Sequence, residues 1–157
     1  LAIASKLPEA EVFAVDISDK ALWLCHENAK RLSLDISCEK LDILNPDGNI
    51  ANLDFDVIVS NPPYVLESQK PFLEKRVSAR EPSLALFVPD TNPLIFYRAL
   101  ADFAIERLKP GGSVYVEIND LLGVETLQQF DASFALIELR QDINGKDRMI
   151  KASNGKK

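Results

Sequence analysis

Short runs of apolar residues alternate along the chain with longer segments in which apolar residues recur every three or four positions. The short runs have the length of β-strands, and the longer segments have the period of amphipathic helices. The strands expected from this pattern are residues 12–16, 36–41, 55–60, 113–118, 135–140 and 148–152. The expected helices are residues 1–7, 19–32, 93–108 and 121–130, with Ser18 or Asp19 as the cap of the second.

These elements predict an α/β fold with a doubly wound, mostly parallel, Rossmann-like sheet, because strands separated by helices form parallel βαβ units. No helix fits between Arg140 and Arg148, so the last two strands should form a C-terminal antiparallel hairpin. The continuous apolar run Phe55–Ser60 is typical of a strand that is buried on both faces.

The connections predict one domain. A turn is expected at Pro110–Gly112 and a less regular segment at residues 64–92, but neither has the composition of an interior linker. Without an internal repeat either, we expect a single domain over residues 1–153, followed by a disordered tail at residues 154–157.

Composition narrows the class of protein. The chain of 157 residues is 46% apolar, which suits a globular domain, but its apolar runs are too short to span a membrane. It opens without the charged and apolar leader of a secreted protein. Cys25 and Cys38 are best interpreted as two reduced thiols, so we expect a cytoplasmic protein. His26 is the only histidine and has no second ligand at metal spacing, so no metal site is expected.

The net charge of -6 argues against attraction to a polyanion, so no direct binding of nucleic acid is expected. Binding would require a local basic patch, and we find one dense cluster in mid-chain. This cluster is more typical of a solvated helix face. It consists of Lys70, Lys75, Arg76 and Arg80.

Two acidic residues stand directly after expected strands. Asp16 follows the first and Asp42 follows the second. Ligands of open parallel sheets bind outside the carboxyl ends of the strands, where Asp16 could accept hydrogen bonds from both ribose hydroxyls and Asp42 could lie beside an adenine amino group. Alternatively, Asp16 caps the next helix and Asp42 belongs to a polar turn. Together they favour a nucleoside ligand.

The strongest chemical motif is Asn61-Pro62-Pro63-Tyr64, which directly follows the strand Phe55–Ser60. Proline fixes its own φ, donates no N–H and favours extended geometry in the residue before it. The motif therefore predicts a stiff turn that displays the Asn61 side chain and backbone carbonyls. The structural alternative is a simple loop.

Such a turn suits the methylation of a planar nitrogen. An amide nitrogen is a poor nucleophile because its lone pair is delocalised into the carbonyl. Its two N–H groups could donate to the Asn61 side-chain oxygen and the Pro62 carbonyl, which would aim the lone pair at a methyl sulfonium, while Tyr64 packs on the flat group. Positioning of this kind is worth roughly 7–11 kcal/mol of barrier.

In these motifs the chain resembles the class I S-adenosylmethionine-dependent methyltransferases, and within them the peptide-chain release factor glutamine methyltransferases. The resemblance covers nearly the whole chain. Its pieces are Ala14–Ser18, Ala21–Leu22, Glu27–Ala29, Leu41–Asp42, Phe55–Tyr64, Glu81–Leu86, Leu108–Gly112, Glu117–Ile118 and Asp142–Arg148. Amino-methylating DNA and RNA enzymes share the Asn-Pro-Pro-Tyr motif, whereas Glu81–Leu86 and Asp142–Arg148 point to the glutamine-methylating family.

The resemblance implies a role for each matching position. S-adenosyl-L-methionine would be the cofactor, with Asp16 on its ribose and with Asp42 and Ile43 beside its adenine. Asn61 would contact both the methionine part of the cofactor and the substrate amide. The residues that would hold the substrate glutamine are Asn61, Pro62, Pro63 and Tyr64. The substrate implied is the glutamine of a Gly-Gly-Gln motif in a translation release factor.

Three departures from the family's pattern are expected to matter. Its first strand with the following glycine-rich loop, and its small N-terminal helical domain, have no counterpart in these residues. The absent strand would lie between those ending at Asp16 and Ser60, so residues 1–157 alone should be poorly stable and bind cofactor weakly. The family also has glycines where this chain has Val88-Pro89-Asp90.

Two other functions fit parts of this pattern. An adenine-N6 or cytosine-N4 methyltransferase acting on DNA or RNA would use the same turn, but such enzymes bring a basic recognition region. A degenerate methyltransferase-like domain that only binds a partner would explain an absent glycine loop, whereas a complete Asn61–Tyr64 motif argues against it.

Overall fold

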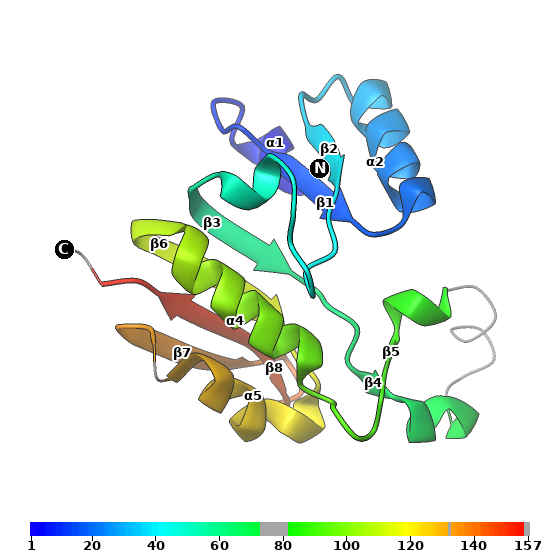
Figure 1. Cartoon of the computed structure of the whole chain (residues 1–157), viewed down its shortest axis with the longest axis vertical. Helices are drawn as coiled ribbons and strands as arrows, with labels where there is room; N and C mark the ends of the chain where they lie inside the picture. The colour runs from blue at the N-terminus through cyan, green and yellow to red at the C-terminus, as the bar shows by residue number, and fades with distance from the viewer. Residues whose placement is uncertain (73–81, 132, 156–157) are drawn as a thin grey trace. The chain divides into compact units, whose positions relative to one another are not determined.

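The computed structural model describes residues 1–72, 82–131 and 133–155. The chain forms two compact units, Leu1–Asn52 and Leu53–Lys157, and each is described by itself (Figure 1). The single domain expected over residues 1–153 stays a prediction. Within the described residues, no helix combines the length and the apolar character that crossing a membrane requires.

The first unit is built on two parallel strands. Its elements in chain order are α1 (Ala2–Lys6), β1 (Phe13–Asp16), α2 (Asp19–Arg31), β2 (Ser37–Lys40) and the 3₁₀ helix η1 (Ile50–Asn52). Ala29 of α2 is buried with Ala4 and Ile36, which packs the helices onto the strand pair. The Ser18 hydroxyl accepts a hydrogen bond from the Ala21 N–H at 3.3 Å, so of the two expected candidates, Ser18 and Asp19, the cap of α2 is Ser18.

The second unit contains a mixed four-stranded sheet. Its strands are β3 (Phe55–Ser60), β6 (Leu108–Glu117), β7 (Leu136–Gln141) and β8 (Asp147–Ser153), in the order β3-β6-β8-β7. β3 and β6 are parallel, whereas β8 runs antiparallel to both β6 and β7. The α/β class and the C-terminal antiparallel hairpin are therefore confirmed.

Helices cover one face of this sheet. α4 (Ile95–Arg107) and α5 (Gly123–Asp131) lie on the same side of it in Figure 1. Val114 and Ile150 on the strands are fully buried. On β3, Val57 and Val59 are 53% and 59% exposed, so the expectation that both faces of this strand are buried is wrong. The reason is that α4 and α5 pack against one face only.

The expected turn at Pro110–Gly112 lies inside strand β6 instead. Phe55 pairs with Leu108, but Val57 pairs with Ser113, so β6 bulges between these two positions. Gly111 has φ +80°, a left-handed conformation that glycine adopts without strain. The bulge is therefore where the glycines are needed, and the strand continues beyond it to Glu117.

Between β3 and α4 the chain forms short elements. They are β4 (Val65–Leu66), η2 (Glu67–Phe72), η3 (Ser83–Ala85) and β5 (Phe87–Val88), with β4 and β5 parallel. At the position where the family has glycines, Val88 is fully buried and the Asp90 carboxylate accepts from the Ser68 N–H at 3.0 Å. Several residues singled out in the sequence lie outside the described residues. They are Lys75, Arg76, Arg80 and Glu81.

Candidate active site

The Asn61–Tyr64 turn leaves the carboxyl end of β3 and leads into β4. Asn61 is exposed, Pro62 is buried, and Pro63 and Tyr64 are half-buried. The two prolines fix their own φ angles, and Val65, the next residue, donates its N–H to the Leu86 carbonyl at 2.9 Å. The turn is thus held between two strands and presents the Asn61 side chain to solvent.

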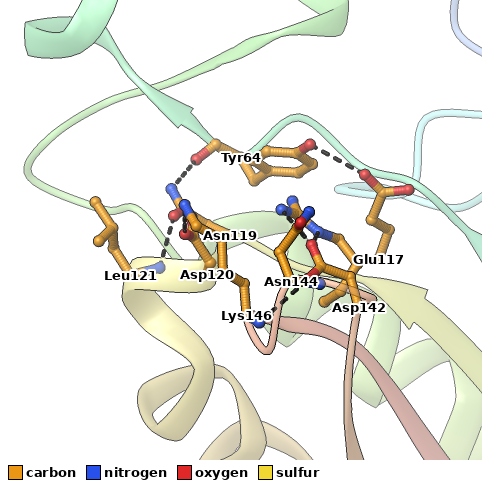
Figure 2. Close-up of polar contacts among 9 residues, drawn as sticks. Tyr64, Glu117, Asn119, Asp120, Leu121, Asp142, Asn144 and Lys146 are labelled. Atoms are coloured by element: carbon orange, nitrogen blue, oxygen red, sulfur yellow. Dashed lines mark hydrogen bonds and ion pairs between the residues drawn. The ribbon is translucent and has the colours of Figure 1, made fainter.

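Tyr64 is held at two separate atoms by residues at the end of β6, the strand that pairs with β3. Its hydroxyl donates to Glu117 Oε1 at 3.0 Å, and its backbone carbonyl accepts from Asn119 Nδ2 at 3.0 Å. Figure 2 shows Tyr64 lying between these two partners. Both the ring and the main chain of this residue therefore have a fixed position.

Asn119 also links the turn to two other elements. Its backbone N–H donates to the Tyr97 hydroxyl of α4 at 3.2 Å, and its Oδ1 accepts from the Leu121 N–H at 3.0 Å. The second bond caps the 3₁₀ helix η4 (Asp120–Leu122). Asn119 is only 5% exposed, so its amide makes these bonds away from water, where losing them is costly.

The electrostatics around Tyr64 keep its hydroxyl protonated. Burial raises the pKa of Tyr64, and the hydrogen bond to Glu117 and that carboxylate's charge raise it further. Burial also raises the pKa of Tyr97. A neutral Tyr64 hydroxyl is the form that can donate to Glu117.

Two ion pairs flank this site from the β7–β8 turn. Arg148 Nη2 lies 3.3 Å from Asp142 Oδ2, and Lys146 Nζ lies 2.8 Å from Asp120 Oδ2. The backbone N–H groups of Asn144 and Lys146 lower the pKa of Asp142, with Arg148 adding to the effect. The Lys146 ammonium similarly lowers the pKa of Asp120. These contacts give the Asp142–Arg148 segment a defined fold beside η4.

The acids of the first unit have local partners. Asp16 is exposed at the end of β1, and its Oδ1 accepts from the Ser18 N–H at 2.8 Å. Asp42 follows β2, and its Oδ1 accepts from the Leu44 N–H at 3.0 Å, with half-buried Ile43 between them. Each acid uses one carboxylate oxygen in its turn, so the polar-turn interpretation of Asp42 is consistent with these contacts, while the cap of α2 is Ser18.

The parallel pairing of β1 and β2 brings these two acids to one edge. Asp16 pairs with Lys40 in the register, and the Leu41 N–H donates to the Asp16 carbonyl at 3.2 Å. Asp16, Asp42 and Ile43 are thus neighbours in the first unit, and the Asn61–Tyr64 turn belongs to the second. Their meeting around one ligand stays a prediction.

Sequence reasoning missed the roles of two residues. Glu117 is part of a segment that resembles the family, but no role follows from that resemblance, and Asn119 is not singled out at all. A signal was present, because both polar residues stand at the carboxyl end of a strand, where sites in α/β sheets form.

Comparison with known proteins gives one family and several close relatives. Residues 1–79 match the sequence model of the methyltransferase small domain. The chain is 43% identical over 154 residues to the release factor glutamine methyltransferase of Flavobacterium psychrophilum, covering 98% of this chain and 53% of that protein. It is 40% identical to the protein of the same description from Bacteroides thetaiotaomicron, covering 98% of this chain and 55% of the relative. The chain thus spans about half the length of these relatives.

A solved structure with the same fold is the 16S rRNA methyltransferase of T. thermophilus, in complex with AdoMet and guanosine. It matches with a TM-score of 0.59 at 16% identity, covering 92% of this chain and 32% of that one. At this identity the match shows a methyltransferase-like α/β fold. The resemblance inferred from the sequence motifs is confirmed by the relatives.

Proposed function

The chain belongs to the methyltransferase small domain family, and from this premise we propose that it is the catalytic portion of a release factor glutamine methyltransferase. It would transfer a methyl group from S-adenosyl-L-methionine to the side-chain amide nitrogen of the glutamine in a Gly-Gly-Gln motif. The identity of 43% over 98% of the chain supports this substrate, and the geometry of Asn61–Tyr64 supports the chemistry.

The observation that carries the proposal is the fixed turn after β3. Asn61 is exposed next to two prolines, and Tyr64 is anchored at its hydroxyl and its carbonyl. The Asn61 side-chain oxygen and the Pro62 carbonyl would each accept one N–H of the substrate amide, and Tyr64 would pack on its plane. Fixed acceptors orient a weak nucleophile without reorganisation, which is how an enzyme lowers the barrier for such a group.

Residues of the first unit fit the adenosyl part of the cofactor. Asp16 is exposed at a strand end and uses one oxygen on Ser18, so it would offer a charged acceptor to the ribose hydroxyls. Asp42 and Ile43, on the neighbouring strand end, would border the adenine. When bound, S-adenosyl-L-methionine supplies the electrophilic methyl group.

This function has consequences for the fold and for location. We propose that the chain has the doubly wound, mostly parallel sheet that its sequence predicts. In the described part of the chain, β1 pairs with β2 alone and β3 with β6 alone, so each has an edge on which a further strand could add. We also propose that the protein acts in the cytoplasm, because a translation release factor is its proposed substrate.

Methylation of DNA or RNA is the alternative that shares this chemistry. The net charge of -6 and the Glu117 carboxylate that is bonded to Tyr64 disfavour a phosphate backbone at the turn. The rRNA enzyme with the same fold is only 16% identical, so it does not carry its substrate over to this chain.

The test offers several acceptors to the full-length parent protein with methyl-labelled S-adenosyl-L-methionine. The acceptors are a release factor, the same factor with alanine for its Gly-Gly-Gln glutamine, a ribosomal protein, tRNA and duplex DNA. We expect label on the intact release factor only. The Asn61→Ala variant should lose about 10²–10³-fold in kcat, as when a fixed hydrogen-bonding group is removed from an active site.

Asn49→Ala is the matched control, because Asn49 is also an exposed asparagine but lies outside the site. It should retain wild-type activity. Label on tRNA or DNA, or equal labelling of the release factor that lacks the glutamine, would refute the proposed substrate.

A further inference from the structure

The two bonds to Tyr64 come from one short segment at the end of β6. Glu117 is the last residue of that strand, and Asn119 follows two positions later. One bond holds the far end of the phenol ring, and the other holds the main chain directly after Pro62 and Pro63. A displacement of either partner therefore moves a different part of the turn.

The Asn119 amide has a single orientation that satisfies its neighbours. Its NH₂ group must face the Tyr64 carbonyl and its oxygen must face the Leu121 N–H, at 3.0 Å each. An aspartate at this position keeps an acceptor for Leu121 but places a second oxygen against the Tyr64 carbonyl. Because the site is 5% exposed, water cannot readily replace the lost donor.

Glu117 acts on the ring rather than on the main chain. Its carboxylate accepts a hydrogen bond from the Tyr64 hydroxyl, and it is half-buried at the strand end. Glutamine at this position would keep an acceptor oxygen, whereas alanine would leave the half-buried hydroxyl without one. Comparing these two substitutions separates the hydrogen bond from the charge.

We propose that Glu117 and Asn119 are positioning residues. They hold the Tyr64 ring in the position in which it packs on the plane of the substrate amide. The inference rests on the proposed function of the Asn61–Tyr64 turn and adds two residues to it. Neither Glu117 nor Asn119 contacts the reacting atoms in this proposal. Their effect reaches the reaction through Tyr64, so they set the rate of transfer and leave the affinity for the cofactor unchanged.

The first test compares two asparagine variants of the full-length parent protein. Asn119→Asp removes the donor to the Tyr64 carbonyl. Asn154→Asp removes an equivalent bond at the opposite end of β6, where Asn154 Nδ2 donates to the Leu108 carbonyl at 3.1 Å. We expect kcat for release factor to fall about 10²-fold in Asn119→Asp, the effect of a misplaced reacting group. Asn154→Asp should keep the wild-type kcat.

The second test uses Glu117, whose half-buried position makes a substitution less damaging to folding. Glu117→Gln should retain much more of kcat than Glu117→Ala, and the dissociation constant for S-adenosyl-L-methionine should be unchanged in both. Adding Glu117→Ala to Tyr64→Phe should lower kcat no further than the worse of the two single variants, because the two changes remove one interaction.

A third readout does not depend on the substrate. With ¹³C-labelled tyrosine, the Tyr64 ring resonances are assigned by their loss in Tyr64→Phe. They should shift in Asn119→Asp and Glu117→Ala and stay in place in Asn154→Asp. If the wild-type protein labels no release factor, the proposed function fails, yet these shifts still decide whether the two residues hold Tyr64.

Two results would overturn the inference. One is an equal loss of kcat in Asn119→Asp and Asn154→Asp, since that would be a general loss of stability. The other is unshifted Tyr64 resonances in both Asn119→Asp and Glu117→Ala.

Discussion

The acids of the first unit and the turn of the second unit are held in different ways. Asp16 and Asp42 each bond to a backbone N–H two residues further along the chain. Tyr64 is held instead by side chains 53 and 55 residues away in the sequence. Local contacts of this kind form whenever the turn forms, whereas the Tyr64 contacts require the whole β3-β6 pairing. The carboxylate contacts of the candidate cofactor residues therefore depend on local geometry, whereas the contacts of the candidate acceptor turn depend on the fold.

Among the substitutions that distinguish the two regions, Asp16→Asn should have the largest effect, which is on cofactor affinity. Asp16→Asn keeps an oxygen for the Ser18 N–H, so the turn should stay intact. It removes a charged acceptor for ribose, and hydrogen bonds to charged groups are worth about 1.5–3 kcal/mol. We expect the dissociation constant for S-adenosyl-L-methionine, measured by calorimetry on the full-length parent protein, to rise roughly 10- to 100-fold.

Asp19→Asn is the control for this experiment. Asp19 forms an exposed ion pair with Lys40 at 2.9 Å in the same unit, and such pairs contribute little. Its cofactor affinity should equal that of the wild type. If Asp16→Asn bound the cofactor as tightly as Asp19→Asn, then Asp16 would serve only the turn.

A somewhat smaller effect is expected from disturbing the long-range packing near the acceptor turn. A Cβ on Gly123, at the start of α5, would lie 2.6 Å from Asp147 Oδ2 and 3.1 Å from its Cβ. Gly123→Ala should therefore displace the Asp147 side chain and lower the free energy of unfolding by about 1 kcal/mol. Chemical denaturation of the full-length parent protein measures this change.

Gly48→Ala provides the local counterpart in the first unit. A Cβ there meets no atom within 4 Å, but the residue has φ +85°. Its cost is the left-handed backbone alone, about 1–2 kcal/mol. Gly123→Ala should also lower kcat, because Asp147 belongs to the Asp142–Arg148 segment that flanks the Tyr64 site. Gly48→Ala should leave kcat unchanged. Equal kcat in the two variants would contradict the contrast between local and long-range support.

The same contrast explains what the sequence could predict. The strand Phe55–Ser60, a helix cap at Ser18 or Asp19 and the C-terminal hairpin all follow from residue patterns within a few positions. The structure confirms the strand and the hairpin and selects Ser18 as the cap. The exposed face of Val57 and Val59 could not be predicted, because an apolar run does not say which helices cover it. The Asn119–Tyr64 bond was also out of reach, since it depends on strand order.

The candidate site divides in the same manner. The Asn61–Tyr64 turn was identifiable because its prolines restrict the backbone locally and its residues match a family. The meeting of that turn with Asp16 and Asp42 is still a prediction, because it depends on how strands from two units are arranged. The Pro110–Gly112 error has a related cause, since glycine and proline indicate a bend but do not distinguish a turn from a bulge within a strand.

The smallest expected effect concerns the pH dependence of stability and tests whether Tyr64 is held by Glu117 in solution. Burial, then the bond to Glu117 and its charge, raise the pKa of Tyr64 above its ordinary value of 10.0. Unfolding returns the phenol to that ordinary value, so above pH 10.0 the unfolded chain binds fewer protons than the folded one. The stabilisation is fully present below this pH and is lost as the pH rises through the folded pKa.

Denaturant titrations of the full-length parent protein between neutral and alkaline pH measure this loss. Tyr64→Phe should show a shallower alkaline decline, by less than about one proton per molecule, and Tyr97, whose pKa burial also raises, should account for part of the remaining slope. The alkaline decline of each variant is measured from its own stability at neutral pH, because the loss of the hydrogen bond already lowers the stability there. Glu117→Gln should fall between the wild type and Tyr64→Phe, since it keeps an acceptor and removes the charge. A decline in Tyr64→Phe as steep as in the wild type would mean that folding does not raise the pKa of Tyr64. A decline in Glu117→Gln as steep as in the wild type would mean that the Glu117 charge does not contribute to that rise.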